Sequence, residues 1–127
     1  MAKKMKKTGP HAIRFLLFIF LIMLLPVYAW PQDRGKTIYD AWCSQCHGIK
    51  GDGKGYAADF VFPKPRDFTR GTYKYKTTPT GYPTTDADIA RIIRNGNPGT
   101  TMPAWKRFSD ADVNALVRYI KKFGVSP

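Results

Sequence analysis

The chain has 127 residues, and its 21 lysines and arginines against 9 aspartates, with no glutamate, give a formal net charge of +12. This length fits one domain, or one domain behind a targeting segment. A composition of 43% hydrophobic and 24% charged residues is typical of a folded globular protein and excludes a disordered or collagen-like chain. Two cysteines are too few for a disulfide-rich secreted scaffold.

The N-terminal residues have the pattern of a secretory signal peptide. A basic start is followed by an uninterrupted apolar run over residues 15–25, and Pro26 ends that run. Val27 and Ala29 then occupy the small-residue positions of a cleavage site, which predicts cleavage after Ala29. The sequence therefore predicts a signal peptide over residues 1–29 and one domain over residues 30–127.

An uncleaved membrane anchor is the alternative interpretation of the same segment. A membrane-spanning helix needs about 20 apolar residues, whereas Phe15 to Trp30 supplies sixteen, interrupted by a proline. Both interpretations send the rest of the chain across the bacterial inner membrane, so we expect a periplasmic domain. Contact with the membrane is expected only if the N-terminal segment is retained.

The remaining charge bears on the partners of the predicted domain. Residues 30–127 contain 16 basic and 9 acidic residues, a net charge of +7. Nucleic acid is not an expected partner of an exported chain, despite this charge. A cationic surface does speed encounters with acidic proteins, and salt screens that attraction.

Three helices are predicted from capping residues and apolar spacing. The first covers residues 33–42, with Asp33 as its N-cap. The second covers residues 86–95, opened by Thr85 with Asp88 and stopped by Asn95-Gly96. The third follows Ser109 and ends at Gly124. Its apolar residues recur at i, i+3, i+4 and i+7 and are Val113, Leu116, Val117 and Ile120.

About forty residues without strong periodicity separate the first two predicted helices. Alternation over residues 71–76 predicts one short strand there. A loop of this length is uncommon in a compact domain. It becomes reasonable if the loop wraps a large apolar cofactor.

The run Cys43-Ser44-Gln45-Cys46-His47 directly follows the first predicted helix. Cys-x-x-Cys-His is the attachment pattern of c-type haem, in which two thiols add to the vinyl groups and the histidine becomes the proximal iron ligand. A disulfide, a redox dithiol and a zinc site are the alternatives. Zinc requires four ligands, and residues 30–127 offer no other cysteine or histidine. A thioredoxin-like site requires a βαβ context that this sequence lacks.

A second axial ligand for a haem iron can be named from the same inventory. His11, Met1, Met5 and Met23 all belong to the N-terminal segment, which leaves Met102 as the single methionine of residues 30–127. It lies in a loop between Gly99 and Pro103, where a core-filling methionine is less expected. A thioether donor there would close the sixth coordination position and raise the reduction potential.

With these residues in place, the chain resembles the class I monohaem cytochromes c over essentially all of residues 30–127. Gly35 and Tyr39 match the small and aromatic positions at which the first helix of that family crosses the last, and Leu116 and Tyr119 match the opposing pair. Pro65 resembles the proline whose carbonyl accepts the N–H of the haem-ligating histidine. The resemblance implies an all-α cytochrome c fold, in which three main helices and long loops enclose one covalently bound haem c.

The resemblance implies electron transfer and no catalysis. His47 and Met102 would be the axial iron ligands, and Cys43 and Cys46 would form the thioethers. Tyr73 and Trp105 are expected to pack on the haem or bond its propionates. We expect a one-electron carrier between periplasmic or membrane redox proteins with acidic docking surfaces. The alternatives are a subunit of a larger oxidoreductase and a haem enzyme or gas sensor from which Met102 dissociates.

Overall fold

The computed structural model describes residues 10–23 and 33–124, in two units, Met1–Pro31 and Gln32–Pro127, that are treated separately. In the first unit, α1 spans Pro10–Met23 and exposes its phenylalanine side chains. Among the described residues, no helix combines the length and apolarity that crossing a membrane requires. The predicted cleavage position after Ala29 lies outside the described residues.

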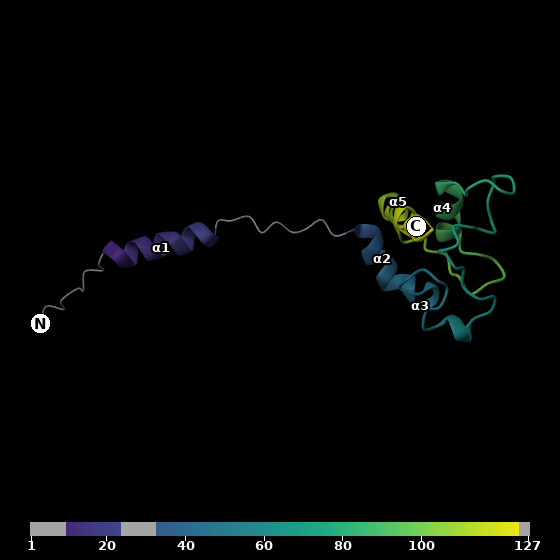
Figure 1. The fold of residues 1–127 in the computed structure, drawn as a ribbon, viewed down its shortest axis with the longest axis horizontal. Coiled ribbons are helices and arrows are strands. Elements are labelled where there is room, and N and C mark those ends of the chain that lie inside the picture. The colour runs from purple at the N-terminus through teal and green to yellow at the C-terminus, as the bar shows by residue number, and fades with distance from the viewer. Residues whose placement is uncertain (1–9, 24–32, 125–127) are drawn as a thin grey trace, which may run out of the picture. The chain divides into compact units, whose positions relative to one another are not determined.

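The second unit is helical, and its described residues contain no strand (Figure 1). Its elements are α2 (Arg34–Trp42), α3 (Ser44–His47), the 3-10 turn η1 (Ala58–Phe60), α4 (Asp86–Asn95) and α5 (Asp110–Phe123). The three predicted helices are α2, α4 and α5, and each bound agrees with its prediction to within one residue. The all-α fold class is therefore confirmed.

In the second unit, a side chain caps the start of α2, of α4 and of α5. Asp33 accepts a hydrogen bond from the backbone N–H of Lys36. Complete capping boxes open the other two helices, and they are formed by Thr85 with Asp88 and by Ser109 with Asp112. These bonds fix where α4 and α5 begin, as the sequence predicted.

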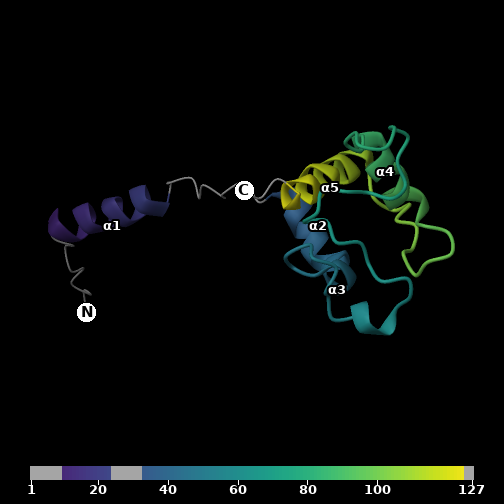
Figure 2. The ribbon, with the colours of Figure 1, turned by 45° about the vertical axis from the view of Figure 1, so that its right-hand side comes forward.

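The core lies where α2 crosses α5 and where α4 packs on α5 (Figure 2). The four periodic apolar residues of α5 are all buried, together with Ile38 and Tyr39 of α2 and Ile89 and Ile93 of α4. A Cβ atom placed on Gly35 would lie 2.2 Å from the carbonyl oxygen of Ala115 and 2.8 Å from the Cβ of Tyr119. Only a glycine permits this close approach of the two backbones.

The strand predicted over residues 71–76 is wrong. Gly71 has a positive φ of 60°, and the chain from there to residue 85 forms bends and turns. The backbone at the end of this segment does not pair with a second strand. The N–H of Thr77 instead donates to the carboxylate of Asp88, 3.1 Å away. Of the two tyrosines in this segment, Tyr73 stacks on Phe68 at 6.1 Å between ring centroids, whereas Tyr75 is 47% exposed.

Asp88 fastens this loop to the start of α4. Its side chain is buried and accepts hydrogen bonds from Thr77 and Thr85, and Arg91 forms an ion pair with it at 3.2 Å. Burial raises the pKa of Asp88, but the hydrogen bonds from Thr77 and Thr85 and the contact with Arg91 outweigh burial and hold the pKa below its ordinary value of 3.8. The folded state therefore favours the ionised carboxylate.

Replacement Gly35→Ala tests the helix crossing. At an exposed helical position this change stabilises by about 1 kcal/mol, because alanine has the higher helix propensity. At the crossing the added methyl group must separate α2 from α5, so we expect net destabilisation of about 1–3 kcal/mol. Thermal unfolding measures the effect, with Ala41→Ser on the exposed face of α2 as control. A rise in Tm for Gly35→Ala would contradict the crossing.

Replacement Asp88→Asn tests the loop anchor through its pH dependence. A lowered pKa in the folded state contributes stability above about pH 3.8, and this contribution is lost as the pH falls towards the folded-state pKa. We expect the variant to unfold at a lower temperature than the wild type at pH 6, and the difference to shrink below pH 4. Asp110→Asn, in an exposed ion pair with Arg94, is the control. A difference independent of pH would contradict the ionised anchor.

Candidate functional site

The cysteine–histidine segment is held at the junction of α2 and α3. The N–H of Cys43 donates to the carbonyl of Tyr39, and the N–H of His47 donates to the carbonyl of Cys43. Residues three and four apart on a helical turn share one face. As a result, the thiols of Cys43 and Cys46 and the ring of His47 all line one cavity of about 870 Å³.

The two cysteines do not form a disulfide in this structure. Burial, with a smaller contribution from Cys46, raises the pKa of the Cys43 thiol to about 12. Redox dithiols work through a lowered thiol pKa, so this environment does not favour that alternative. Over residues 10–23 and 33–124, no group of three or more Cys, His, Asp and Glu side chains is placed to hold a metal ion. This geometry does not favour the zinc alternative either.

His47 is oriented by a backbone carbonyl on the facing loop. Its Nδ1 lies 3.0 Å from the carbonyl oxygen of Arg66, which can only accept, so Nδ1 carries the proton and Nε2 keeps a free lone pair. Burial lowers the pKa of His47, and the bond to Arg66 partly opposes this shift. The ring also stacks on Phe68 at 4.4 Å between centroids. A neutral imidazole fixed in this way can bind a metal through Nε2.

The prediction that Pro65 supplies this acceptor is wrong by one residue. Its carbonyl oxygen instead lies against the turn at Gly53, 2.8 Å from the point that a Cβ atom on that glycine would occupy. Successive carbonyls along an extended chain point to opposite sides. Arg66, the next residue, therefore presents its carbonyl to His47. Pro65 lines the cavity.

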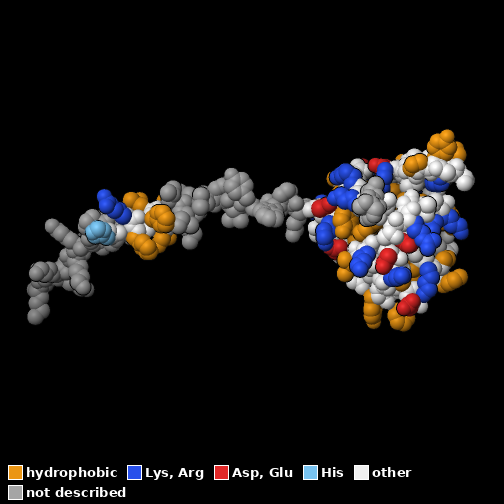
Figure 3. Space-filling view, viewed as in Figure 1, with side chains coloured by type: hydrophobic (Ala, Val, Ile, Leu, Met, Phe, Trp, Pro, Cys, Tyr) orange, Lys and Arg blue, Asp and Glu red, His pale blue; other side chains and the backbone are white. Residues whose placement is uncertain are grey.

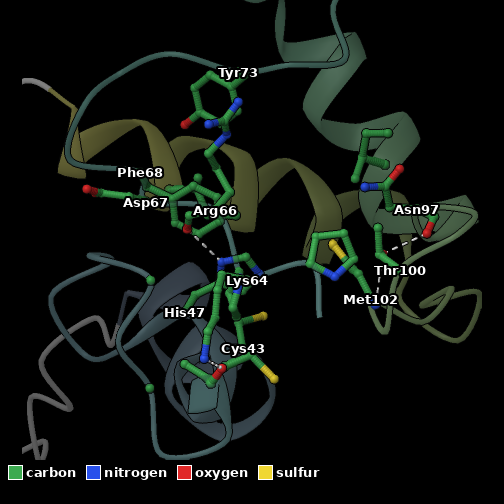
Figure 4. A pocket seen from close by; sticks show the side chains of 18 of the residues that line it. Cys43, His47, Lys64, Arg66, Asp67, Phe68, Tyr73, Asn97, Thr100 and Met102 are labelled. Atoms are coloured by element: carbon green, nitrogen blue, oxygen red, sulfur yellow. Dashed lines mark hydrogen bonds between the residues drawn. The ribbon is translucent and has the colours of Figure 1, made fainter. Parts of the chain in front are cut away.

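Met102 lies across the cavity from His47, in the loop between α4 and α5 (Figure 4). Its N–H donates to Thr100 Oγ1, and its carbonyl accepts the N–H of Asn97 at 3.2 Å. Gly96 ends α4 with a φ of 71°, and a Cβ atom there would lie 2.8 Å from the carbonyl oxygen of Met102. These contacts fix the backbone of Met102 at the cavity wall.

The other predicted site residues, Tyr73 and Trp105, line the same cavity. Burial raises the pKa of the Tyr73 hydroxyl, against an opposing contribution from Arg66, so the phenol stays neutral and can donate. Trp105 is tied to α4 by a bond from its N–H to the carbonyl of Ile93. It lies 5.8 Å from the ring of Trp42, centroid to centroid.

Trp42 and Thr84 also line the cavity, and neither was predicted from the sequence as a site residue. Trp42, the last residue of α2, is 47% exposed at the cavity. The hydroxyl of Thr84 is buried at the cavity without a hydrogen-bond partner in the structure. A buried polar atom needs a partner, and no sequence signal distinguishes this threonine from its neighbours Thr77, Thr78, Thr80 and Thr85.

These residues fit a haem group. Two thiols and an imidazole lie across the cavity from a thioether (Figure 4), and the apolar side chains of Phe68, Ile89 and Ile93 line the same cavity. The hydroxyl of Thr84, which has no partner in the structure, could donate a hydrogen bond to a carboxylate at the edge of a porphyrin. The donor set of one imidazole and one thioether is that of electron-transferring cytochromes c.

Most acidic side chains are paired with basic ones, whereas several basic side chains at the cavity are unpaired within the described residues. Eight of the nine aspartates form ion pairs with lysine or arginine. In the part of the chain that the structure describes, Lys54, Arg66 and Lys74 line the cavity without such a pair. Uncompensated positive charge is therefore present at the cavity.

Comparisons with known proteins agree with this geometry. Residues 31–120 match the family described as "Cytochrome C oxidase, cbb3-type, subunit III". The "Cbb3-type cytochrome c oxidase subunit CcoP" of Azospirillum brasilense is 32% identical over 93 residues, which are 72% of this chain and 28% of that protein. The chain thus spans little more than a quarter of the length of that relative.

A shorter relative and a solved structure cover the same region. "Cytochrome c-554(547)" of Halothiobacillus neapolitanus is 32% identical over 88 residues, which are 68% of this chain and 89% of that protein. A chain of the "Kuenenia stuttgartiensis reducing HAO-like protein complex Kustc0457/Kustc0458" is 41% identical, with a TM-score of 0.69. That match covers 71% of this chain and 41% of the other.

The helical fold, the Cys-x-x-Cys-His cavity and the match over residues 31–120 lead to one conclusion: the chain belongs to the cytochrome c family described as cytochrome c oxidase, cbb3-type, subunit III, whose members carry covalently bound haem c and transfer electrons.

Proposed function

We propose that this protein is a periplasmic one-electron carrier in which Cys43 and Cys46 form thioether bonds to a single haem c and His47 and Met102 are the axial ligands. The observation that carries the proposal is the placement of His47 and Met102 on facing walls of one cavity that both cysteines also line (Figure 4). Haem c supplies an iron that accepts and releases one electron.

The protein's own residues hold the site ready for that exchange. The carbonyl of Arg66 keeps the proton on Nδ1 of His47 and directs Nε2 into the cavity. The hydroxyl of Thr100 accepts the N–H of Met102, the N–H of Asn97 donates to the Met102 carbonyl, and both bonds hold the Met102 loop. If His47 and Met102 both bind the iron, they would leave no coordination site for a substrate, and the haem would supply one-electron exchange. These features support a carrier over a haem enzyme or gas sensor.

Tyr73 and Thr84 are suited to the cofactor's carboxylates. A neutral phenol and an unpartnered hydroxyl both line the cavity. Trp105, supported by Trp42, would pack against the macrocycle. Pro65 lines the cavity and would contact the cofactor.

The electron partners are proposed to be redox proteins with acidic surfaces. Lys54, Arg66 and Lys74 supply uncompensated positive charge at the cavity, the region through which electrons would pass. A permanent subunit of a larger periplasmic or membrane oxidoreductase is the second candidate. The CcoP relative and the Kuenenia chain favour it, since the first is a subunit and the second was solved within a complex.

Export is part of the proposal, because residues 1–29 have the basic start, apolar run and small-residue positions of a secretory signal peptide. A cleaved signal over residues 1–29 releases the domain, and a retained segment would anchor it to the inner membrane.

Replacement Met102→Ala tests the axial ligand. Loss of the thioether opens one coordination position and removes the donor that favours reduced iron. We expect the methionine–iron charge-transfer band to vanish, carbon monoxide to bind the reduced variant, and the potential to fall by more than about 59 mV, a tenfold change in the one-electron equilibrium. Lys106→Ala, exposed near the end of the same loop, is the control. An unchanged spectrum would refute this ligand assignment.

Intact mass tests attachment and export together. Protein produced with haem-maturation machinery is expected to have the mass of residues 30–127 plus one haem. Cys43→Ser and Cys46→Ser each remove one thioether, so covalent attachment should be weakened or lost, whereas the exposed spacer change Gln45→Ala should leave it intact. Full attachment in both serine variants would contradict the thioether assignment, and a mass that includes residues 1–29 would favour the anchor.

A further inference from the structure

Three aromatic side chains are exposed to solvent on the segment between the end of α3 and Pro65. Tyr56, Phe60 and Phe62 are 83%, 80% and 85% exposed. The rings of Tyr56 and Phe60 lie 6.2 Å apart between centroids, Phe62 follows two residues later in the chain, and the three residues are called the aromatic face. In Figure 3, apolar side chains protrude from the lower edge of the domain, where Figure 1 places η1. None of the three lines the cavity, so a cofactor held there does not cover them. Exposed apolar side chains that cluster, as the neighbouring rings of Tyr56 and Phe60 do, can mark an interaction site.

The backbone beneath the aromatic face is fixed to the cysteine–histidine helix. The N–H of Gly55 donates to the carbonyl of Cys46 at 3.1 Å, and the N–H of Ala57 donates to the carbonyl of Gln45 at 2.8 Å. Lys64 closes η1 from the other side, with Nζ 2.8 Å from the carbonyl of Ala58. The backbone that carries the three rings is therefore ordered before a partner binds, which lowers the entropic cost of binding.

Charge at the edge of this face indicates the chemistry of its occupant. Lys64 is compensated by Asp59 at 3.2 Å. Lys54, two residues before Tyr56, and Arg66 form no ion pair within the described residues, and both line the adjoining cavity. Aromatic side chains beside unpaired cations fit a protein surface that is apolar at its centre and carries aspartates or glutamates at its rim.

We propose that the aromatic face is the docking site for the redox partner protein of this cytochrome, and that the partner offers an apolar patch edged by carboxylates. The inference rests on the proposed electron-carrier function. A partner seated there contacts the segment whose backbone is bonded to Gln45 and Cys46, so it lies beside the haem-attachment helix. Short separation between cofactors is what electron transfer between proteins requires.

Two other occupants fit the observations less well. Recognition of an anionic membrane surface typically uses clusters of about 4–8 basic residues, whereas Lys54 and Arg66 are the unpaired cations adjoining this face in the described chain. A second copy of the chain would bring the same two cations into opposition, and like charges across an interface are unfavourable.

The experiment first identifies the partner and then measures transfer to it. The full-length protein, carrying the photo-cross-linker p-benzoylphenylalanine at position 60, is produced in its own host and irradiated, and the cross-linked protein is identified and purified. Stopped-flow spectroscopy then gives the second-order rate constant for electron transfer between that partner and the holoprotein. The variants are Phe60→Ser with Phe62→Ser, and Tyr82→Ser as a matched control that is 66% exposed outside the face.

We expect the double variant to lose at least tenfold in the rate constant with the partner, and Tyr82→Ser to retain the wild-type value. Oxidation by ferricyanide and the visible spectrum should be unchanged in both, because neither depends on docking. Added salt should slow the wild type, and Lys54→Gln should reduce that salt dependence. A holoprotein that ferricyanide cannot oxidise would instead refute the proposed carrier function, so the two failures are distinguishable.

Three results would overturn the docking proposal. The first is an equal rate constant for the double variant and the wild type. The second is a cross-link between two copies of this chain together with a dimer in analytical ultracentrifugation. The third is co-sedimentation with phosphatidylcholine–phosphatidylglycerol vesicles that the double variant loses, because the face would then contact a membrane.

Discussion

The rest of this domain depends on one constraint: several side chains belong both to the buried core and to the lining of the cavity. Phe68, Ile89, Ile93 and Ile120 belong to the buried core and also line the cavity of about 870 Å³. A chain of fewer than 100 residues in its folded unit has little apolar surface to spare. The cofactor therefore completes the core of this domain, and its binding stabilises the fold as well as supplying the chemistry.

The helix crossing and the cofactor site are joined through Tyr39. Its ring is fully buried between α2 and α5, 5.3 Å from the ring of Tyr119, and its hydroxyl donates to the carbonyl of Gly48 at 2.7 Å. Gly48 directly follows His47, so the same side chain that packs the crossing also fixes the end of α3. Displacing α2 from α5 would consequently move the imidazole relative to the cavity.

The sequence was sufficient for features encoded by local chemistry and insufficient for those set by distant contacts. The caps at Asp33, Thr85 and Ser109 are local hydrogen bonds, and all three are present in the structure. The acceptor for His47 was misassigned to Pro65 because which carbonyl faces the ring depends on how that loop packs on Gly53. Thr84 and the aromatic face were missed for the same reason, since composition does not reveal a missing partner or an outward orientation.

The arrangement of charge and exposed aromatic surface connects the two candidate functions. A freely diffusing carrier gains from long-range attraction, which the unpaired Lys54, Arg66 and Lys74 can supply. A permanent subunit gains from buried apolar contact, which Tyr56, Phe60 and Phe62 can supply. The backbone that carries these rings is bonded to α3, and burying the rings on association would remove apolar surface from water. In either role, charge would select the partner and the aromatic rings would retain it.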